Sequence, residues 1–291
     1  MRFAHLATSA GSEARLAVVV TDRAVFADDL IEDAPRDLQE LIERGDDLPA
    51  RLERASEQAE SDTGLWHPVS ELRHASAVLR PPVVLAIGAN YAAHSAELAL
   101  KVEKAATVFA LWPNSLSAHE GTTTWPSELS SEVDYEAELG VIIGRPARDV
   151  RVVDALDYVF GYTVVNDITA RNLQFSEAQW SRCKSFDGFT PTGPVVVTAD
   201  QIPDPQDLWL ATTVDGRLLQ DASTSGMVRS VAELIAFLSR STTLQPGTLI
   251  STGSPGGAGY SRTPPVFLHD GATVTVSCSG IGALTTHCRV I

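Results

Sequence analysis

The stretch Val133–Gly144 constrains the fold of this chain most, because it is both strongly β-forming and rich in acidic residues. Its β-branched run Val141-Ile142-Ile143 predicts a strand. Side chains on a strand alternate between its two faces, so Asp134, Glu136 and Glu138 are expected to point the same way. Carboxylates crowded on one face repel one another and are costly to desolvate. The pattern therefore predicts a positive charge beside this strand.

A hard divalent cation bound through oxygen is the simplest source of that charge, and Mg²⁺, Mn²⁺ or Ca²⁺ suits carboxylates better than zinc does. A Glu-x-Glu pair standing alone is more often the solvated polar face of an edge strand. Other parts of the chain must therefore decide between a metal site and a plain surface.

The composition limits the function classes that remain. The 291 residues are 44% hydrophobic and 20% charged, an ordinary balance for a globular protein that is large enough for a core and two domains. The net charge of −15, with no basic stripe to offset it, argues against a nucleic-acid partner. No apolar run reaches the length of a signal-peptide core or a membrane span, so no membrane partner and a cytoplasmic location are expected.

The cysteines agree with a reducing compartment. Cys183, Cys278 and Cys288 show no C-x-x-C spacing, which argues against a disulfide framework and against a zinc site built from thiolates.

The chain divides near residue 78 into a small N-terminal domain (1–78) and a larger domain (79–291). In the first part, Leu16–Val20 and Ala24–Ala27 predict a hairpin. Two short amphipathic helices are expected between Pro35 and Glu60, with a break at Gly45-Asp46-Asp47. The pair Pro81-Pro82 then precedes a new buried strand, 83–87.

The second part is mostly β, so the predicted fold class is α+β, mainly β. Asp215-Gly216 is a strong hairpin signal, and Ser230 with Glu233 forms a capping box before the helix 234–238. The other expected strands are 160–165, 195–197, the run from Leu249, 273–276 and 283–290.

His94 and Glu97 are three residues apart and would share one face of a helical turn. A carboxylate beside an imidazole fixes its tautomer and raises its basicity, as a general base for water requires. A surface helix with a neighbouring His and Glu by chance is the commoner explanation for such a pair.

Two later residues add to the candidate site. Asp167 follows a β-rich run and could be a third carboxylate ligand or, equally, a helix N-cap. Lys184 could neutralise a substrate carboxylate, although a lone lysine is usually just solvated. The glycine-rich turn after Leu249 would let backbone N–H groups approach an anion, but it lacks the ending of a P-loop.

Taken together, these segments resemble the fumarylacetoacetate hydrolase family over roughly residues 83 to 291. The motifs that carry the resemblance are, in order, Gly88-x-Asn90-Tyr91-x-x-His94-x-x-Glu97, Asp134-Tyr135-Glu136-x-Glu138-Leu139, Asn166-Asp167-x-x-Ala170-Arg171-x-x-Gln174, Lys184-Ser185-Phe186-Asp187, Pro191-x-Gly193-Pro194 and Gly253-Ser254-Pro255-x-Gly257. The resemblance implies a mixed β-roll catalytic domain, usually a homodimer, with a divalent metal (Mg²⁺ or Mn²⁺, with Ca²⁺ also open) at its mouth. Residues 1–75 look like the variable N-terminal domain of many bacterial members.

The resemblance also implies roles for individual residues. The metal ligands would be Glu136, Glu138 and Asp167; the catalytic group would be His94, Glu97 and Lys184; the substrate would be held by Arg171, Gln174, Tyr91 and Ser254, with help from Lys184. The dyad would lie on a lid, about Tyr91 to Val108, that orders when ligand binds.

The expected activity is hydrolysis of a C–C bond in a 2,4-dioxo acid, such as an acylpyruvate or a fumarylacetoacetate-like compound, by water that His94 and Glu97 activate. Related enolate chemistry would also serve an isomerase or decarboxylase of a dicarboxylic oxo acid in aromatic catabolism. A member without catalytic activity, which binds metal and oxo acid only, is a third possibility, although the complete dyad and carboxylate set count against it.

Two positions depart from the family pattern. Leu111 stands where members commonly carry a lysine, which predicts a neutral or apolar distal end of the substrate if Leu111 faces the site. Ser254 replaces the usual threonine and keeps its hydroxyl.

Overall fold

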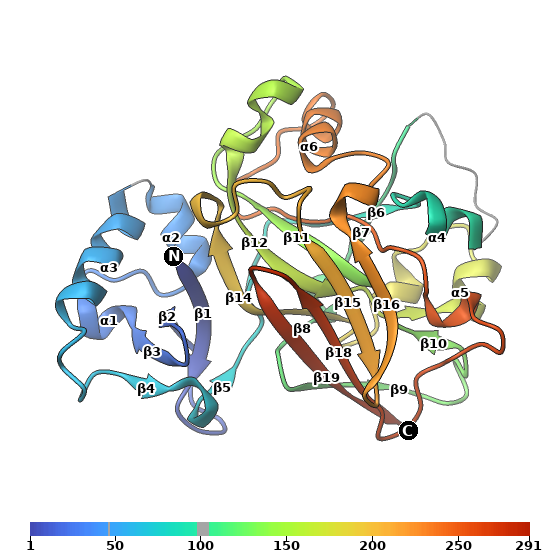
Figure 1. Ribbon diagram of the computed structural model, residues 1–291, viewed down its shortest axis with the longest axis horizontal. Coiled ribbons are helices and arrows are strands. Elements are labelled where there is room, and N and C mark those ends of the chain that lie inside the picture. The colour runs from blue at the N-terminus through green and yellow to red at the C-terminus, as the bar shows by residue number, and fades with distance from the viewer. Residues whose placement is uncertain (46, 98–104) are drawn as a thin grey trace.

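The computed structural model describes residues 1–45, 47–97 and 105–291, which form mainly β-structure with a few short helices (Figure 1). The strands are β1 (Arg2–Ala7), β2 (Arg15–Val20), β3 (Arg23–Phe26), β4 (His67–Pro68), β5 (Arg73–His74), β6 (Val84–Gly88), β7 (Thr107–Leu111), β8 (Leu116–Ser117), β9 (Gly121–Trp125), β10 (Val133–Asp134), β11 (Ala137–Ile143), β12 (Val159–Asn166), β13 (Thr169–Ala170), β14 (Thr190–Thr198), β15 (Trp209–Val214), β16 (Arg217–Ser223), β17 (Leu249–Ser251), β18 (Thr273–Cys278) and β19 (Gly282–Val290). The α-helices are α1 (Ala27–Leu30), α2 (Leu38–Arg44), α3 (Asp47–Gln58), α4 (Ala92–Glu97), α5 (Arg171–Ser176) and α6 (Val231–Ser239).

The largest sheet has the order β4-β3-β2-β1-β14-β12-β11-β17-β6-β7, and the smaller five-stranded sheet has the order β16-β15-β18-β19-β9. The smaller sheet packs against the central strands of the larger one, and a main hydrophobic core lies between them. Leu139 and Val141 of β11 point into this core, whereas Ile142 points into a second core on the other face. Burial of both faces explains the continuous apolar run at the end of β11.

The N-terminal strands extend the same large sheet, because β1 pairs antiparallel with β14 through Phe3 and Val196. The hairpin β2–β3 and the helices α2 and α3 form as the sequence predicts, and Gly45 ends α2 with a positive φ of 94°. Leu41 of α2 and Leu52 of α3 pack into the second core. The domain boundary near residue 78 stays a prediction.

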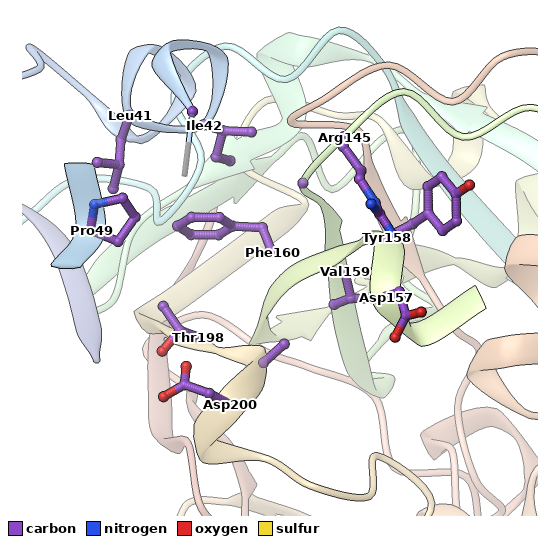
Figure 2. A pocket seen from close by; sticks show the side chains of 13 residues that line it. Leu41, Ile42, Pro49, Arg145, Asp157, Tyr158, Val159, Phe160, Thr198 and Asp200 are labelled. Carbon is purple, nitrogen blue, oxygen red and sulfur yellow. The ribbon is translucent and has the colours of Figure 1, made fainter. Parts of the chain in front are cut away.

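A cavity of about 300 Å³ lies at the junction between these helices and the large sheet (Figure 2). Leu41, Ile42 and Pro49 face Phe160 across it, and Arg145 stacks over the ring of Tyr158 with 4.3 Å between the guanidinium carbon and the ring centroid. None of the predicted site residues lines this cavity.

Several local predictions are confirmed. Asp215 and Gly216 form the two-residue turn of the β15–β16 hairpin, and both bonds of the capping box between Ser230 and Glu233 are present at the start of α6. The three cysteines are buried and free. No helix in the described ranges is both long and apolar enough to span a membrane.

One element differs from the prediction. Val133–Gly144 is not a single strand: β10 ends at Asp134, β11 begins at Ala137, and β10 pairs with the short β13 instead of the large sheet. The interruption separates Asp134 from the two glutamates that follow it.

Candidate metal centre

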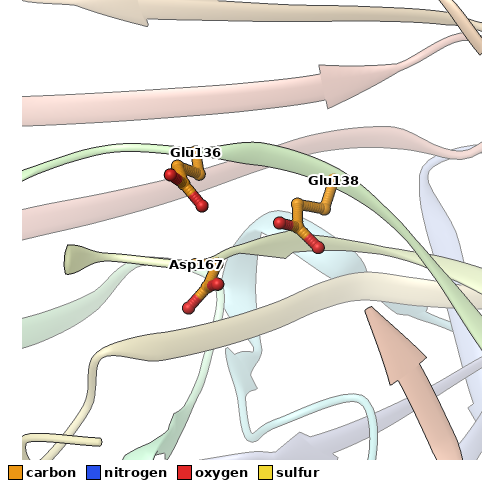
Figure 3. Close-up of side chains that lie close together, drawn as sticks. All are labelled: Glu136, Glu138 and Asp167. Carbon is orange, nitrogen blue, oxygen red and sulfur yellow. The ribbon is translucent and has the colours of Figure 1, made fainter. Parts of the chain in front are cut away.

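Three carboxylates converge where β11 begins and β12 ends (Figure 3). In the antiparallel register Ala137 lies opposite Asn166, so Asp167 follows the end of β12 beside Glu136 and Glu138. The N–H of Asp167 donates to the carbonyl of Glu136 at 3.0 Å, which fixes this junction. Glu136, Glu138 and Asp167 are at most 4% exposed, and one oxygen from each lies within 4.8 Å of the others.

Lys184 reaches this group from the 3₁₀ turn Arg182–Lys184. Its Nζ donates to Glu136 Oε2 at 2.8 Å, to Asp167 Oδ2 at 2.6 Å and to Thr169 Oγ1 at 2.8 Å. Burial alone would lower the pKa of Lys184, but Asp167 and Glu136 outweigh it and raise the pKa above its usual value. The ammonium therefore stays charged and is shared between two carboxylates.

Arg171 is 0% exposed, and all three nitrogens of its guanidinium donate to protein atoms. Its Nε donates to Asp134 Oδ1 at 2.7 Å, its Nη2 to Glu136 Oε1 at 2.6 Å and its Nη1 to Gln174 Oε1 at 2.8 Å. Asp134 thus supports Arg171 and is not one of the three converging carboxylates, although the same guanidinium joins it to Glu136. In this arrangement Arg171 orients Glu136 and Gln174.

The ionisation of the three carboxylates differs. Burial would raise the pKa of Glu136, but the charges of Lys184 and Arg171 and the bond from His94 hold it well below the ordinary value. Burial, together with the charges of Asp167 and Glu136, raises the pKa of Glu138 well above its usual range. Burial is also the main reason that the pKa of Asp167 rises to about 6.

A divalent cation fits this donor set. With Asp134 included, four carboxylates face the two cations Arg171 and Lys184, which leaves two negative charges if all are ionised. Among the residues that the structure describes, the buried Asp167 Oδ1 has no hydrogen-bond partner, although a buried carboxylate oxygen normally has one. Glu136, Glu138 and Asp167 are therefore suited to hold a divalent cation that prefers oxygen ligands.

Glu138 is placed by the glycine-rich turn. Its Oε2 accepts bonds from Ser251 Oγ and from the N–H of Gly253 at 2.8 Å. Gly253 has a φ of 98°, and a Cβ there would lie 2.9 Å from the carbonyl oxygen of Ile87, so glycine is required for this approach.

His94 lies on α4, is 5% exposed, and places its Nε2 3.3 Å from Glu136 Oε1. Its buried Nδ1 has no hydrogen bond to any described residue and lies 3.9 Å from Glu97 Oε2, which is beyond hydrogen-bond length. Glu97 accepts bonds from the N–H of Gly257 at 2.9 Å and from Ser261 Oγ at 3.0 Å. In this conformation Glu97 fastens α4 to the glycine-rich turn and does not yet orient His94.

The space around the carboxylates is narrow, about 10 Å³, which is room for one water molecule or one ion. Its walls are Ile87, Gly88, Ala89, His94, Phe109, Glu136, Glu138, Asp167, Gln174, Trp180, Lys184 and Ser254. Most of the predicted catalytic and binding residues therefore meet in one place. Tyr91, Glu97 and Arg171 do not line it, although Arg171 binds Glu136 and Gln174 of its wall.

The expectation about Leu111 is wrong. Leu111 is 3% exposed and belongs to the second hydrophobic core, with Val84 and Ile142, and it is absent from the cavity wall. The substitution of the family's lysine therefore concerns packing. Phe109, two residues earlier on the same face of β7, is the residue of this strand that lines the cavity.

Sequence reasoning missed several residues of the site. Trp180 lines the cavity in an edge-on contact with Phe109 (5.5 Å between centroids), and a Cβ on Gly88 would lie 2.3 Å from its ring. Thr169 and Ser251 bind site side chains directly. The glycine of the Gly88-x-Asn90 motif was a signal for a close neighbour, but nothing in the sequence names that neighbour.

The predicted lid falls partly outside the described residues. Residues 98–104, which include Leu98-Ala99-Leu100, lie outside the described residues. Of the rest of this segment, the structure describes Tyr91, α4 and the residues from 105 onward.

The chain matches the model of the fumarylacetoacetate hydrolase C-terminal domain over residues 83–289. Among solved structures, fumarylacetoacetate hydrolase from Exiguobacterium antarcticum is 33% identical, with a TM-score of 0.85 and full coverage of both chains (100% and 100%). Maleylpyruvate hydrolase from Sphingobium sp. SYK-6 in complex with manganese(II) and pyruvate is 29% identical, with a TM-score of 0.81 and coverage of 100% and 99%.

A third structure is an isomerase. The 5-carboxymethyl-2-hydroxymuconate delta-isomerase from Mycobacterium smegmatis is 28% identical, with a TM-score of 0.76 and coverage of 100% of both chains. The match over residues 83–289, which span more than two thirds of the sequence, settles the classification. The chain belongs to the fumarylacetoacetate hydrolase family.

Proposed function

We propose that this protein is a divalent-metal-dependent hydrolase that cleaves a C–C bond of a 2,4-dioxo acid, such as an acylpyruvate or a fumarylacetoacetate-like substrate. The observation that carries the proposal is the buried group Glu136, Glu138 and Asp167 with the imidazole of His94 only 3.3 Å from Glu136. A metal-binding carboxylate group and a general base in one narrow cavity suit the activation of water beside an oxo acid.

A bound Mg²⁺ or Mn²⁺ would supply Lewis-acid polarisation of the oxo-acid oxygens. Lys184 and Arg171 hold Glu136 ionised and in place, so that it remains a ligand. The oxygen of Gln174 is taken by Arg171, which leaves its NH₂ group for a substrate oxygen. Ser254 offers a hydroxyl to the same space.

His94 takes a proton from water, and the hydroxyl oxygen forms a bond to the carbonyl carbon at the distal end of the substrate. The bond between this carbon and the neighbouring methylene carbon then breaks, and its electron pair stays on the methylene carbon. That carbon receives the proton from His94. The products are a carboxylic acid and pyruvate, which together account for the dioxo acid and one water.

Orientation of His94 by Glu97 would require a change of partner. Glu97 would have to leave Gly257 and Ser261 and approach Nδ1 of His94, which has no hydrogen bond within ranges 1–45, 47–97 and 105–291. A cavity of about 10 Å³ also has to widen before a dioxo acid can enter. Movement of α4 would accomplish both changes at once.

A second candidate function is isomerisation or decarboxylation of a dicarboxylic oxo acid. One observation favours it: Glu97 binds Gly257 and is held away from His94, and an isomerase is also among the similar structures. Such reactions need proton transfer to or from carbon but no attacking water.

A product assay separates the two. Purified protein with Mg²⁺ or Mn²⁺ is given acetylpyruvate, and pyruvate and acetate are measured; a hydrolase forms both in equal amounts. The second function would be supported instead if 2-hydroxymuconate-type acids were consumed without release of a second carboxylic acid and acetylpyruvate were not turned over.

A further inference from the structure

A buried amide lies behind the glycine-rich turn. Gln220 of β16 is 1% exposed and makes four hydrogen bonds. Its Oε1 accepts from the N–H of Ala137 at 2.9 Å and from Thr212 Oγ1 at 2.8 Å. Its Nε2 donates to Ser254 Oγ and to the carbonyl of Pro255, both at 2.9 Å.

The partners of Gln220 fix the orientation of its amide. The N–H of Ala137 can only donate, and the carbonyl of Pro255 can only accept, so a flipped amide would set like groups against each other at both ends. The NH₂ group must therefore face Ser254.

This orientation determines what the hydroxyl of Ser254 can do. Its oxygen accepts a bond from Gln220, and within the described part of the chain its own hydrogen has only the carbonyl of Pro255, at the long distance of 3.3 Å. That carbonyl already receives the shorter bond from Gln220. Because Ser254 lines the cavity, its hydrogen is free to turn toward an oxygen of a ligand.

Gln220 also connects the turn to the metal-binding strand. Ala137, whose N–H it binds, lies between Glu136 and Glu138. The turn contacts the hairpin closely: a Cβ on Gly257 would lie 2.5 Å from the carbonyl oxygen of Leu219, the residue before Gln220. One side chain thus holds Ser254 in register with two of the carboxylates.

We propose that Gln220 is a positioning residue that keeps the hydroxyl of Ser254 available as a hydrogen-bond donor to an anionic oxygen of the oxo acid. The proposal deepens the proposed function and rests on it. In Gln220→Glu the new carboxylate still accepts from Ala137 and Thr212 but has no N–H for Ser254 or Pro255. The Ser254 hydrogen then turns toward that carboxylate and is lost to the ligand.

The test is binding of oxalate, a small planar dianion, to the protein in the presence of Mg²⁺, measured by calorimetry without turnover. Gln220→Glu and Ser254→Ala should each weaken oxalate binding roughly tenfold or more, the value of a hydrogen bond to a charged group. The double variant should be no weaker than the weaker single variant. Affinity for Mg²⁺ alone should stay unchanged in Gln220→Glu.

Two further variants guard the interpretation. Gln220→Met buries no charge, so it remains folded if the glutamate does not; it also leaves Pro255 without its donor, and oxalate binding should fall similarly. Gln39→Glu is a matched control, because Gln39 is a buried amide that donates to the carbonyl of Pro246, far from the cavity. It should lower the melting temperature and leave oxalate binding unchanged.

Additive losses in the double variant, or unchanged oxalate binding in both Gln220 variants, would overturn the role of Gln220. Absence of oxalate binding by the unchanged protein would overturn it as well. If oxalate binds as expected but no dioxo acid is turned over, the proposed reaction fails while the role of Gln220 stands.

Discussion

Among single residues, Glu138 lies in a position that disfavours its own charged form. Burial and two neighbouring carboxylates raise its pKa well above the ordinary value, so the charged form is unfavourable without a cation. Glu138→Gln removes this repulsion and keeps an oxygen that can accept from Ser251 and Gly253. We expect the metal-free variant to melt at the same or a higher temperature than the unchanged protein.

The same substitution should weaken binding of Mg²⁺ or Mn²⁺ by at least roughly tenfold, because a charged ligand is lost. Calorimetric titration and the shift of the melting temperature on adding metal measure this. Glu132→Gln, the same chemical change outside the cavity, is the control. Unchanged metal affinity in Glu138→Gln would remove Glu138 from the site.

His94 is the residue on which the hydrolysis depends. His94→Asn should lower kcat for an acylpyruvate by about 10²–10⁴, because a general base is lost, while metal affinity changes much less. Stopped assays of pyruvate release with His269→Asn as an exposed-histidine control check this. A small loss of kcat would mean that another group moves the proton.

Some residues of the site could be identified from the sequence and others could not. Glu136, Glu138 and Asp167 were recognisable from their motifs, and they do converge. The break between β10 and β11 was not predictable, because only the pairing of β10 with β13 reveals it. Gln220 and Trp180 could not be found, since their contacts depend on how a hairpin and a loop distant in sequence pack.

At the scale of secondary-structure elements, His5 joins β1 to the start of α2. Its Nδ1 donates to the carbonyl of Ser76 at 3.0 Å, and its Nε2 accepts from the N–H of Leu38 at 3.0 Å. A second proton on His5 would oppose the N–H of Leu38. Burial is the main reason that its pKa lies below the ordinary value.

This geometry predicts a pH effect on stability. Because the folded state disfavours protonated His5, its contribution is fully present above about pH 6.5 and is lost as the pH falls from there toward the lower folded pKa. The loss is at most about 1.4 kcal/mol per pH unit. The free energy of unfolding can be measured with urea at pH 7.5, 6.5 and 5.5 for the unchanged protein and for His5→Asn. It should change less with pH in the variant.

A matching control is His269→Gln, because His269 is exposed and its backbone bond to Asp270 raises its pKa. Removal of His269 should not reduce the change of the free energy of unfolding with pH. If the free energy of unfolding changes equally with pH in His5→Asn and in the unchanged protein, protonation of His5 does not destabilise the folded state.

The elements with strong local signals were predictable: the Asp215-Gly216 hairpin, the capping box at Ser230 and the break at Gly45 all depend on neighbours in sequence. The order of strands was not, because the β1–β14 pairing joins residues nearly 200 positions apart and leaves no periodic trace. For the same reason the position of Leu111 inside the core could not be read from the motif.

At the level of the whole molecule, segments far apart in the sequence meet at one narrow cavity, among them the start of β11, the end of β12, the turn after β17, helix α4 and the turn that carries Lys184. Each segment alone has an ordinary structural explanation. Their convergence is what favours a metal-dependent enzyme over the binding-only member that the sequence left open.

If the proposed function is right, turnover requires a divalent cation held by Glu136, Glu138 and Asp167. The most direct measurement is release of pyruvate from acetylpyruvate by the purified protein, after treatment with EDTA and again after addition of Mg²⁺ or Mn²⁺, beside Glu138→Gln. We expect no release after chelation, recovery with either metal, and little recovery in the variant. Release that is indifferent to EDTA, or equal in Glu138→Gln, would contradict it.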